Sequence, residues 1–179
     1  MVQKPLPADN ATRLALREAI AALELTQRTG QVWALAEARL GLARCYRLLG
    51  ALPMALALLE SGLQACQGTD QRVELLCERI DVLAQHAEML EALGPGRGRD
   101  TRDAAREHVF EASGLAARVA DARWEVTVLL HLSDVLDRFG DRGDAVNLQS
   151  RALRLMADTA QSGCPDPTLL PGLGRLADG

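Results

Sequence analysis

The residues best suited to catalysis or metal binding are scattered along this chain of 179 residues. Its histidines, His86, His108 and His131, fall in separate helical stretches, and no His-Glu-x-x-His motif is present. Glu107 directly precedes His108, and neighbouring residues lie on different faces of a helix. A zinc site or an acid–base site needs several such groups converging on one point. The sequence therefore predicts that the chain is not an enzyme and uses no metal or other cofactor.

The segment 94–99 reads Gly-Pro-Gly-Arg-Gly-Arg and has the glycine content of a phosphate-binding loop. A phosphate-binding loop of the common type ends in Gly-Lys-Ser or Gly-Lys-Thr and follows a strand. Both features are missing here, so the segment is typical of a loop between two helices. Contact of its arginines and Arg102 with a small anion remains the alternative.

The composition indicates which kind of fold must position these residues. Alanine and leucine are the most frequent residues, whereas aromatic residues make up only 3% of the chain. Alanine and leucine favour helices, while strands favour β-branched and aromatic residues. The hydrophobic fraction of 48% is ample for a core, and the longest apolar run, 51–59, is too short to span a membrane. We therefore expect an all-helical protein that forms a single domain with a hydrophobic core.

The net charge and the cysteines indicate which class of partner the protein binds and in which cellular compartment it is found. The net charge of −4 argues against nucleic-acid binding, which needs a basic surface. The first residues lack the apolar core of a signal peptide. The four cysteines, Cys45, Cys66, Cys77 and Cys164, form no Cys-x-x-Cys pair and are expected to be reduced thiols. We expect a cytoplasmic protein whose partner is a protein or peptide, with no nucleic acid and no membrane.

Apolar spacing and capping residues predict about seven helices. Their expected ranges are about 10–29, 32–49, 52–66, 70–93, 100–120, 123–139 and 144–160. Asp70 is the expected cap of the fourth helix, and Asp100 or Thr101 that of the fifth. Beyond residue 160, glycines and prolines disfavour a further helix. The sequence therefore predicts a helical domain over 1–160 and a Pro/Gly-rich tail or linker over 161–179.

A pattern of small and large residues repeats around turn glycines at 50, 94 and 140. The three copies contain Ala43, Tyr46, Ala55, Leu59 and Gly62; Ala87, Leu90, Ala105, Val109 and Ala112; and Ser133, Leu136, Ala145, Gln149 and Ala152. Small residues let two helices approach closely, and glycine permits a left-handed turn between them. We therefore expect three helical hairpins, each with an apolar face that needs a neighbour.

This pattern resembles that of the tetratricopeptide repeat (TPR) family over about residues 31–156. The resemblance implies an α-α superhelix, or solenoid, of about three hairpins with the first helix as an N-terminal cap. The turn glycines are 44 and 46 residues apart, which is more than the family's unit of about 34 residues. Longer helices explain this spacing, and such long repeats look like those of bacterial regulatory proteins.

In the TPR family the first helices of the hairpins line a concave groove. The resemblance places there Glu37, Leu40, Arg44 and Arg47; Asp81, Ala84, Glu88 and Glu91; and Thr127, Leu130, Asp134 and Asp137. Such a groove would be basic at one end and acidic along the rest. Family members that bind chaperones hold a terminal carboxylate with Lys and Asn, and these positions have neither. A partner carrying Arg or Lys, or an amphipathic helix, fits better, with a solvated face as the alternative.

The expected function is that of a non-catalytic protein–protein interaction scaffold. A first alternative is a sensory or dimerising domain of a larger signalling protein, such as a diguanylate cyclase or transcription regulator, with a homodimer as one form. Residues 166–175 loosely resemble the opening of diguanylate cyclase domains. A second alternative is a sensor with a ligand between Trp33 and Arg44 or Arg47. Trp33 and Trp124 are otherwise expected to pack between hairpins.

Overall fold

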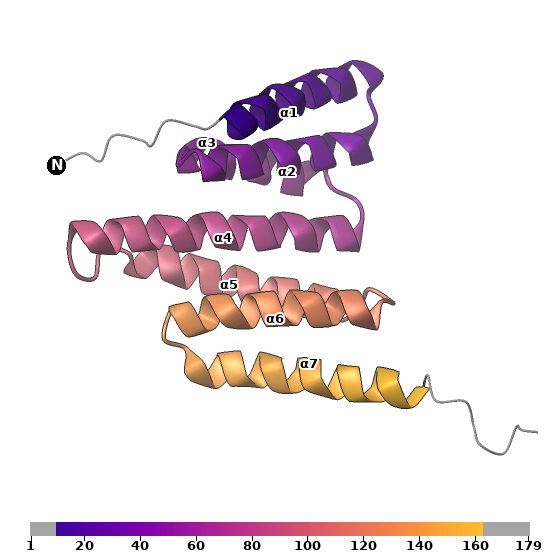
Figure 1. Cartoon of the computed structure of the whole chain (residues 1–179), viewed down its shortest axis with the longest axis vertical. Coiled ribbons are helices and arrows are strands. Elements are labelled where there is room, and N and C mark those ends of the chain that lie inside the picture. Colours follow the sequence, from indigo (N-terminus) through magenta and orange to yellow (C-terminus); the bar gives the residue numbers. More distant parts are fainter. Residues whose placement is uncertain (1–9, 163–179) are drawn as a thin grey trace, which may run out of the picture.

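The computed structural model describes residues 10–162, and the predicted tail and Cys164 lie outside this range. Within it the chain forms seven α-helices and no strand, so the predicted all-helical fold is confirmed (Figure 1). The helices are α1 (Asn10–Thr29), α2 (Val32–Leu48), α3 (Leu52–Ala65), α4 (Thr69–Leu93), α5 (Arg99–Ala116), α6 (Ala122–Arg138) and α7 (Arg142–Ser162). No helix in this part of the chain has both the length and the apolar character that a membrane span requires.

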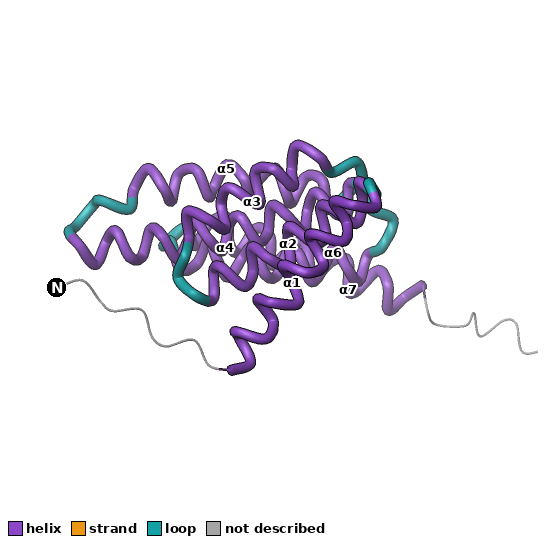
Figure 2. The backbone as a smooth tube through the Cα atoms, turned by 90° about the horizontal axis from the view of Figure 1, so that it is seen from above, coloured by secondary structure: helices purple, strands orange, loops and turns teal. Residues whose placement is uncertain are grey.

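The helices pack as hairpins that follow one another along the molecule. The most extensive contacts join α2 to α3, α4 to α5 and α6 to α7, and α1 packs against α2. Successive hairpins contact each other most extensively through α3 and α4 and through α5 and α6, and also through their first helices, α2 with α4 and α4 with α6. The loops that connect the helices lie at the two ends of the helices (Figure 2). We call the surface formed by α2, α4 and α6 the first-helix face.

The small residues of the repeating pattern lie in the core. All nine of these residues are buried: Ala43, Ala55, Gly62, Ala87, Ala105, Ala112, Ser133, Ala145 and Ala152. Their burial at equivalent places in all three hairpins is what close helix packing requires. The second hairpin follows this rule even though its loop is longer than the other two.

Helix α4 is buried on two sides. Leu75 and Val82 belong to a core cluster with α2 and α3. Val73, Leu76 and Ile80 belong to a second cluster with α5, α6 and α7. The apolar residues of α4 therefore surround much of its circumference, because the helix fills the centre of the stack.

Glycines end several helices, with one departure from the prediction. Gly30, Gly50 and Gly140 have φ values of 67°, 73° and 84°, as expected for left-handed turns. Gly94 instead has extended backbone with φ 163°, so its predicted left-handed turn is wrong. In the longer second loop Gly96 takes the left-handed conformation, with φ 80°.

The predicted N-caps of the fourth and fifth helices are wrong. Gly68 and Gly98 occupy the N-cap positions of α4 and α5, whereas Asp70 and Asp100 lie in the first turns. Carboxylates in a first turn still interact favourably with the helix dipole. Helix α5 ends at Ala116, earlier than expected, and α7 begins at Arg142, also earlier.

The two kinds of turn glycine predict different effects of alanine. Gly140→Ala should lower the free energy of unfolding by about 1 kcal/mol, because a Cβ disfavours the left-handed conformation. Gly94→Ala should cost less than half as much, because the added Cβ would meet only the flexible Arg97 side chain, at 3.1 Å from Nε. Urea unfolding of the two variants measures the difference, and equal losses would contradict this assignment of the turns.

Candidate functional site

The residues predicted to line a groove lie on α2, α4 and α6 but differ in exposure. Glu37, Arg44, Glu88, Thr127, Asp134 and Asp137 are exposed, and Leu130 is 40% exposed. Arg47, Asp81 and Glu91 are half-buried. Leu40 and Ala84 belong to the core, at 3% and 0% exposure. The face therefore offers charged side chains from all three hairpins above an apolar floor.

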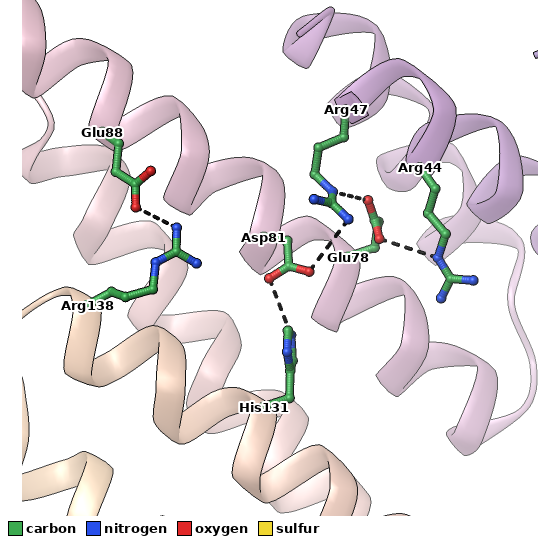
Figure 3. Close-up of polar contacts among 7 residues, drawn as sticks. All are labelled: Arg44, Arg47, Glu78, Asp81, Glu88, His131 and Arg138. Atoms are coloured by element: carbon green, nitrogen blue, oxygen red, sulfur yellow. Dashed lines mark hydrogen bonds and ion pairs between the residues drawn. The ribbon is translucent and has the colours of Figure 1, made fainter. Parts of the chain in front are cut away.

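The centre of this face is an ion-pair cluster around Glu78 of α4 (Figure 3). The Glu78 side chain is only 4% exposed. It accepts hydrogen bonds from Arg47 Nε at 2.6 Å and from Arg44 Nε at 3.4 Å. The predicted basic end of the groove is thus compensated by a buried carboxylate. Sequence reasoning missed Glu78, although two arginines spaced by one turn were a signal that an acidic partner was needed.

Asp81, one turn after Glu78, extends the cluster to α6 (Figure 3). Its carboxylate lies 3.9 Å from Arg47 Nη2 and 3.3 Å from His131 Nε2. Burial raises the pKa of Asp81, and the positive charges of His131 and Arg47 only partly oppose this effect. Residues from three hairpins are therefore joined through two carboxylates of α4.

A hollow of about 470 Å³ lies beside this cluster. It is lined by Arg47, Asp81, Gln85, Glu88 and Arg138. Arg138 of α6 forms an ion pair with Glu88 of α4, and both side chains are largely exposed to solvent. Acidic and basic groups alternate around this hollow, so it is polar without a strong excess of either charge.

Glu91 has a structural partner at the end of α4. Its carboxylate accepts hydrogen bonds from the Gly96 N–H at 2.8 Å and from Arg102 Nη2 at 2.6 Å. The bond from the Gly96 backbone is the main reason why the pKa of Glu91 is lowered. Glu91 therefore anchors the 94–98 loop.

Another hollow, of about 350 Å³, lies between the N-terminal halves of α2 and α4. We call it the α2–α4 hollow. Its lining residues are Trp33, Glu37, Leu40, Gly68, Asp70, Gln71 and Glu74. None of its three carboxylates forms an ion pair with another described residue. This hollow therefore carries the uncompensated negative charge that the cluster around Glu78 lacks.

The two tryptophans have different environments. Trp124 packs against the larger core cluster, as predicted. Trp33 is 64% exposed, so the prediction that it packs between hairpins is wrong. Trp33 also lies 11 residues before Arg44 on α2, about 16 Å along the helix. Trp33 lines a hollow with residues of α4, whereas Arg47 lines a different hollow with Asp81 and Glu88.

The arginines near the 94–98 loop surround a hollow of about 450 Å³ with Gly96. Arg102 is paired with Glu91, and Arg106 with both Asp103 and Asp141. Of the arginines lining this hollow, only Arg99 lacks an ion pair with the described residues. Most of the positive charge is therefore already neutralised.

The histidines do not converge on one site. His131 lies beside Asp81, whereas His108 lies 3.7 Å from Glu111 on α5. Among residues 10–162, no group of three or more His, Cys, Asp or Glu side chains could hold a metal ion. Among the described residues, the charged surface of the first-helix face is therefore the candidate functional site.

His108 predicts a measurable pH dependence of stability. Burial and the nearby positive charge of Arg79 lower the pKa of His108. As the pH falls, the unfolded chain is protonated first, near the ordinary histidine pKa of about 6.5. The free energy of unfolding should therefore decrease below that pH, down to the folded-state pKa. His108→Gln should flatten this part of the profile, and an unchanged profile would contradict the assignment.

The chain matches no family model, and no curated protein matches its sequence. The functional interpretation therefore depends on the geometry of the face. That geometry consists of three connected hairpins, a central ion-pair cluster and an acidic hollow at one end.

Proposed function

We propose that the chain is a non-catalytic, cytoplasmic protein–protein interaction scaffold built of TPR-like hairpins in a superhelix. Its first-helix face would bind a peptide or helix of a partner protein. The observation that carries this proposal is the connection of α2, α4 and α6 by ion pairs through Glu78, Asp81 and Glu88. Such pairs hold the first helices in fixed positions and so give a partner a preorganised surface.

The remaining charges on the face support a basic or amphipathic partner. Glu37, Asp134 and Asp137 are exposed and have no ion pair with the described residues. Leu130 is exposed on the same side of α6 as Asp134 and Asp137, at steps of four and three residues. A helix with an apolar stripe flanked by Arg or Lys would complement this arrangement.

One observation favours a second candidate, a dimerising regulatory domain of a larger signalling protein. Helix α7 exposes Val146, Leu153 and Met156 at 56%, 63% and 49%. An apolar stripe on the last described helix could pack against a second copy. Sedimentation of the full chain and of Leu153→Glu tests this candidate. A concentration-dependent dimer that the substitution abolishes would support it, and a monomer in both cases would contradict it.

Selection of peptides from a random library on the immobilised full chain tests the interaction function. We expect enriched peptides that are basic or amphipathic. Asp134→Asn combined with Asp137→Asn should weaken their binding about tenfold, because two attractive charges are lost. Glu18→Gln combined with Glu107→Gln is the matched control, since both residues are exposed carboxylates on α1 and α5. A library that yields no binder, or binders unaffected by the first pair, would contradict the proposal.

A further inference from the structure

The α2–α4 hollow combines an exposed aromatic side chain with carboxylates. Trp33 is 64% exposed, although a tryptophan usually buries most of its large apolar surface. Trp124 also stands in the first turn of the first helix of a hairpin, but it is partly buried and packs against the larger core cluster. Most of the surface of Trp33 is therefore available for contact, whereas part of that of Trp124 is covered by the core.

The charge of this hollow is negative and uncompensated. Glu37 and Glu74 lie in the second turns of α2 and α4, and Asp70 lies in the first turn of α4. No arginine, lysine or histidine lines the hollow. This distinguishes it from the hollow beside Glu88, where Arg47 and Arg138 are part of the lining.

The walls of the hollow are held by contacts within the fold. Gln71 Nε2 of α4 donates a hydrogen bond to the Trp33 carbonyl oxygen at 2.8 Å. Leu40, which is 3% exposed, contributes a buried apolar floor. The start of α2 is therefore tied to the start of α4, and the hollow does not depend on a ligand to bring its two sides together.

We propose that the α2–α4 hollow holds an arginine side chain of the partner, an inference that rests on the proposed interaction function. A guanidinium group is planar and positively charged, so it can stack on an indole and donate hydrogen bonds to carboxylates at the same time. A volume of about 350 Å³ suits one long side chain but not a whole helix. The ammonium group of lysine supplies the charge without the planar stacking surface, so arginine is the preferred side chain.

Titration with N-acetyl-arginine amide, followed by NMR of the indole N–H signals, tests this inference on the full chain. Only Trp33 and Trp124 give such signals, and Trp33→Phe assigns them. We expect the Trp33 signal to shift and the Trp124 signal to stay. N-acetyl-citrulline amide, which has nearly the same shape without the charge, should bind at least about tenfold more weakly. Equal shifts with both compounds, or no shift of Trp33, would overturn the inference.

Matched variants separate the hollow from the rest of the face. Glu37→Gln combined with Glu74→Gln should abolish the arginine-dependent shift, whereas Glu18→Gln combined with Glu107→Gln should preserve it. Retention of the shift in the first pair would also overturn the inference. Failure of the proposed function gives a different result, because the peptide library would then yield no binder, or only binders that are unaffected by Asp134→Asn combined with Asp137→Asn. Library binders that are insensitive to changes at Glu37 and Glu74 would reject the arginine site alone.

Discussion

Glu78→Gln is expected to lower the free energy of unfolding by about 2–3 kcal/mol. The reason is the burial of this carboxylate, which is 4% exposed and faces two guanidinium groups. Glutamine has a similar shape but no charge, so Arg47, at 27% exposure, would lose its main partner in a partly buried position. The expected loss of unfolding free energy is below the largest values known for buried ion pairs. The reason is that Arg44 is 53% exposed, so its guanidinium group can be solvated by water instead.

A second ion pair on α4 provides the control for this substitution. Glu111 of α5 accepts hydrogen bonds from Arg72 Nε and Nη2 at 3.0 and 2.6 Å. Both side chains are considerably exposed, so Glu111→Gln should cost less than about 1 kcal/mol. Urea unfolding gives both values, and a double-mutant cycle of Glu78→Gln with Arg47→Gln should show a coupling of about 1 kcal/mol or more. A loss for Glu78→Gln no greater than that for Glu111→Gln would contradict the central position of Glu78.

Gly98→Ala is expected to cost about 3 kcal/mol, because the position has no room for a Cβ. An added Cβ would lie 2.4 Å from the carbonyl oxygen of Ala87 and 3.1 Å from its carbonyl carbon. These atoms belong to the backbone of α4, which cannot move away as a flexible side chain would. The substitution should push α5 away from α4 and weaken the contact of the second hairpin.

Gly114→Ala on the same helix should have the opposite effect. Gly114 is exposed, and a Cβ there would meet no atom within 4 Å. Alanine favours helix over glycine, so the free energy of unfolding should rise by about 0.5–1 kcal/mol. Thermal unfolding of both variants shows whether the free energy of unfolding falls for Gly98→Ala and rises for Gly114→Ala. A neutral Gly98→Ala would contradict the close approach of α4 and α5.

The periodic features of this chain could be predicted from its sequence. Apolar spacing and glycines located all seven helices to within a few residues, since these signals are local. The small residues Ala43, Ala87 and Ser133 were recognised as packing positions because their spacing repeats, and all three are buried. Local pattern also explains the correct prediction of the left-handed turns at Gly50 and Gly140.

The pairing of charges could not be predicted in the same way. Glu78 lies 34 and 31 residues from Arg44 and Arg47, so their contact depends on the rotation of α4 relative to α2. Similarly, nothing local distinguishes Trp33, which is exposed, from Trp124, which is partly buried against the core. Glu37 was predicted to lie on the surface, but the hollow that it shares with Glu74 exists only because α2 and α4 lie side by side.

The location of a bound peptide is the most direct test of the proposed scaffold. Amide NMR of the full chain, recorded with the tightest library peptide, should show the largest shifts on α2, α4 and α6. Within that face, we expect the strongest effects around Glu37 and Glu74. Shifts confined to α3 and α5, or to the exposed side of α7, would contradict binding on the first-helix face.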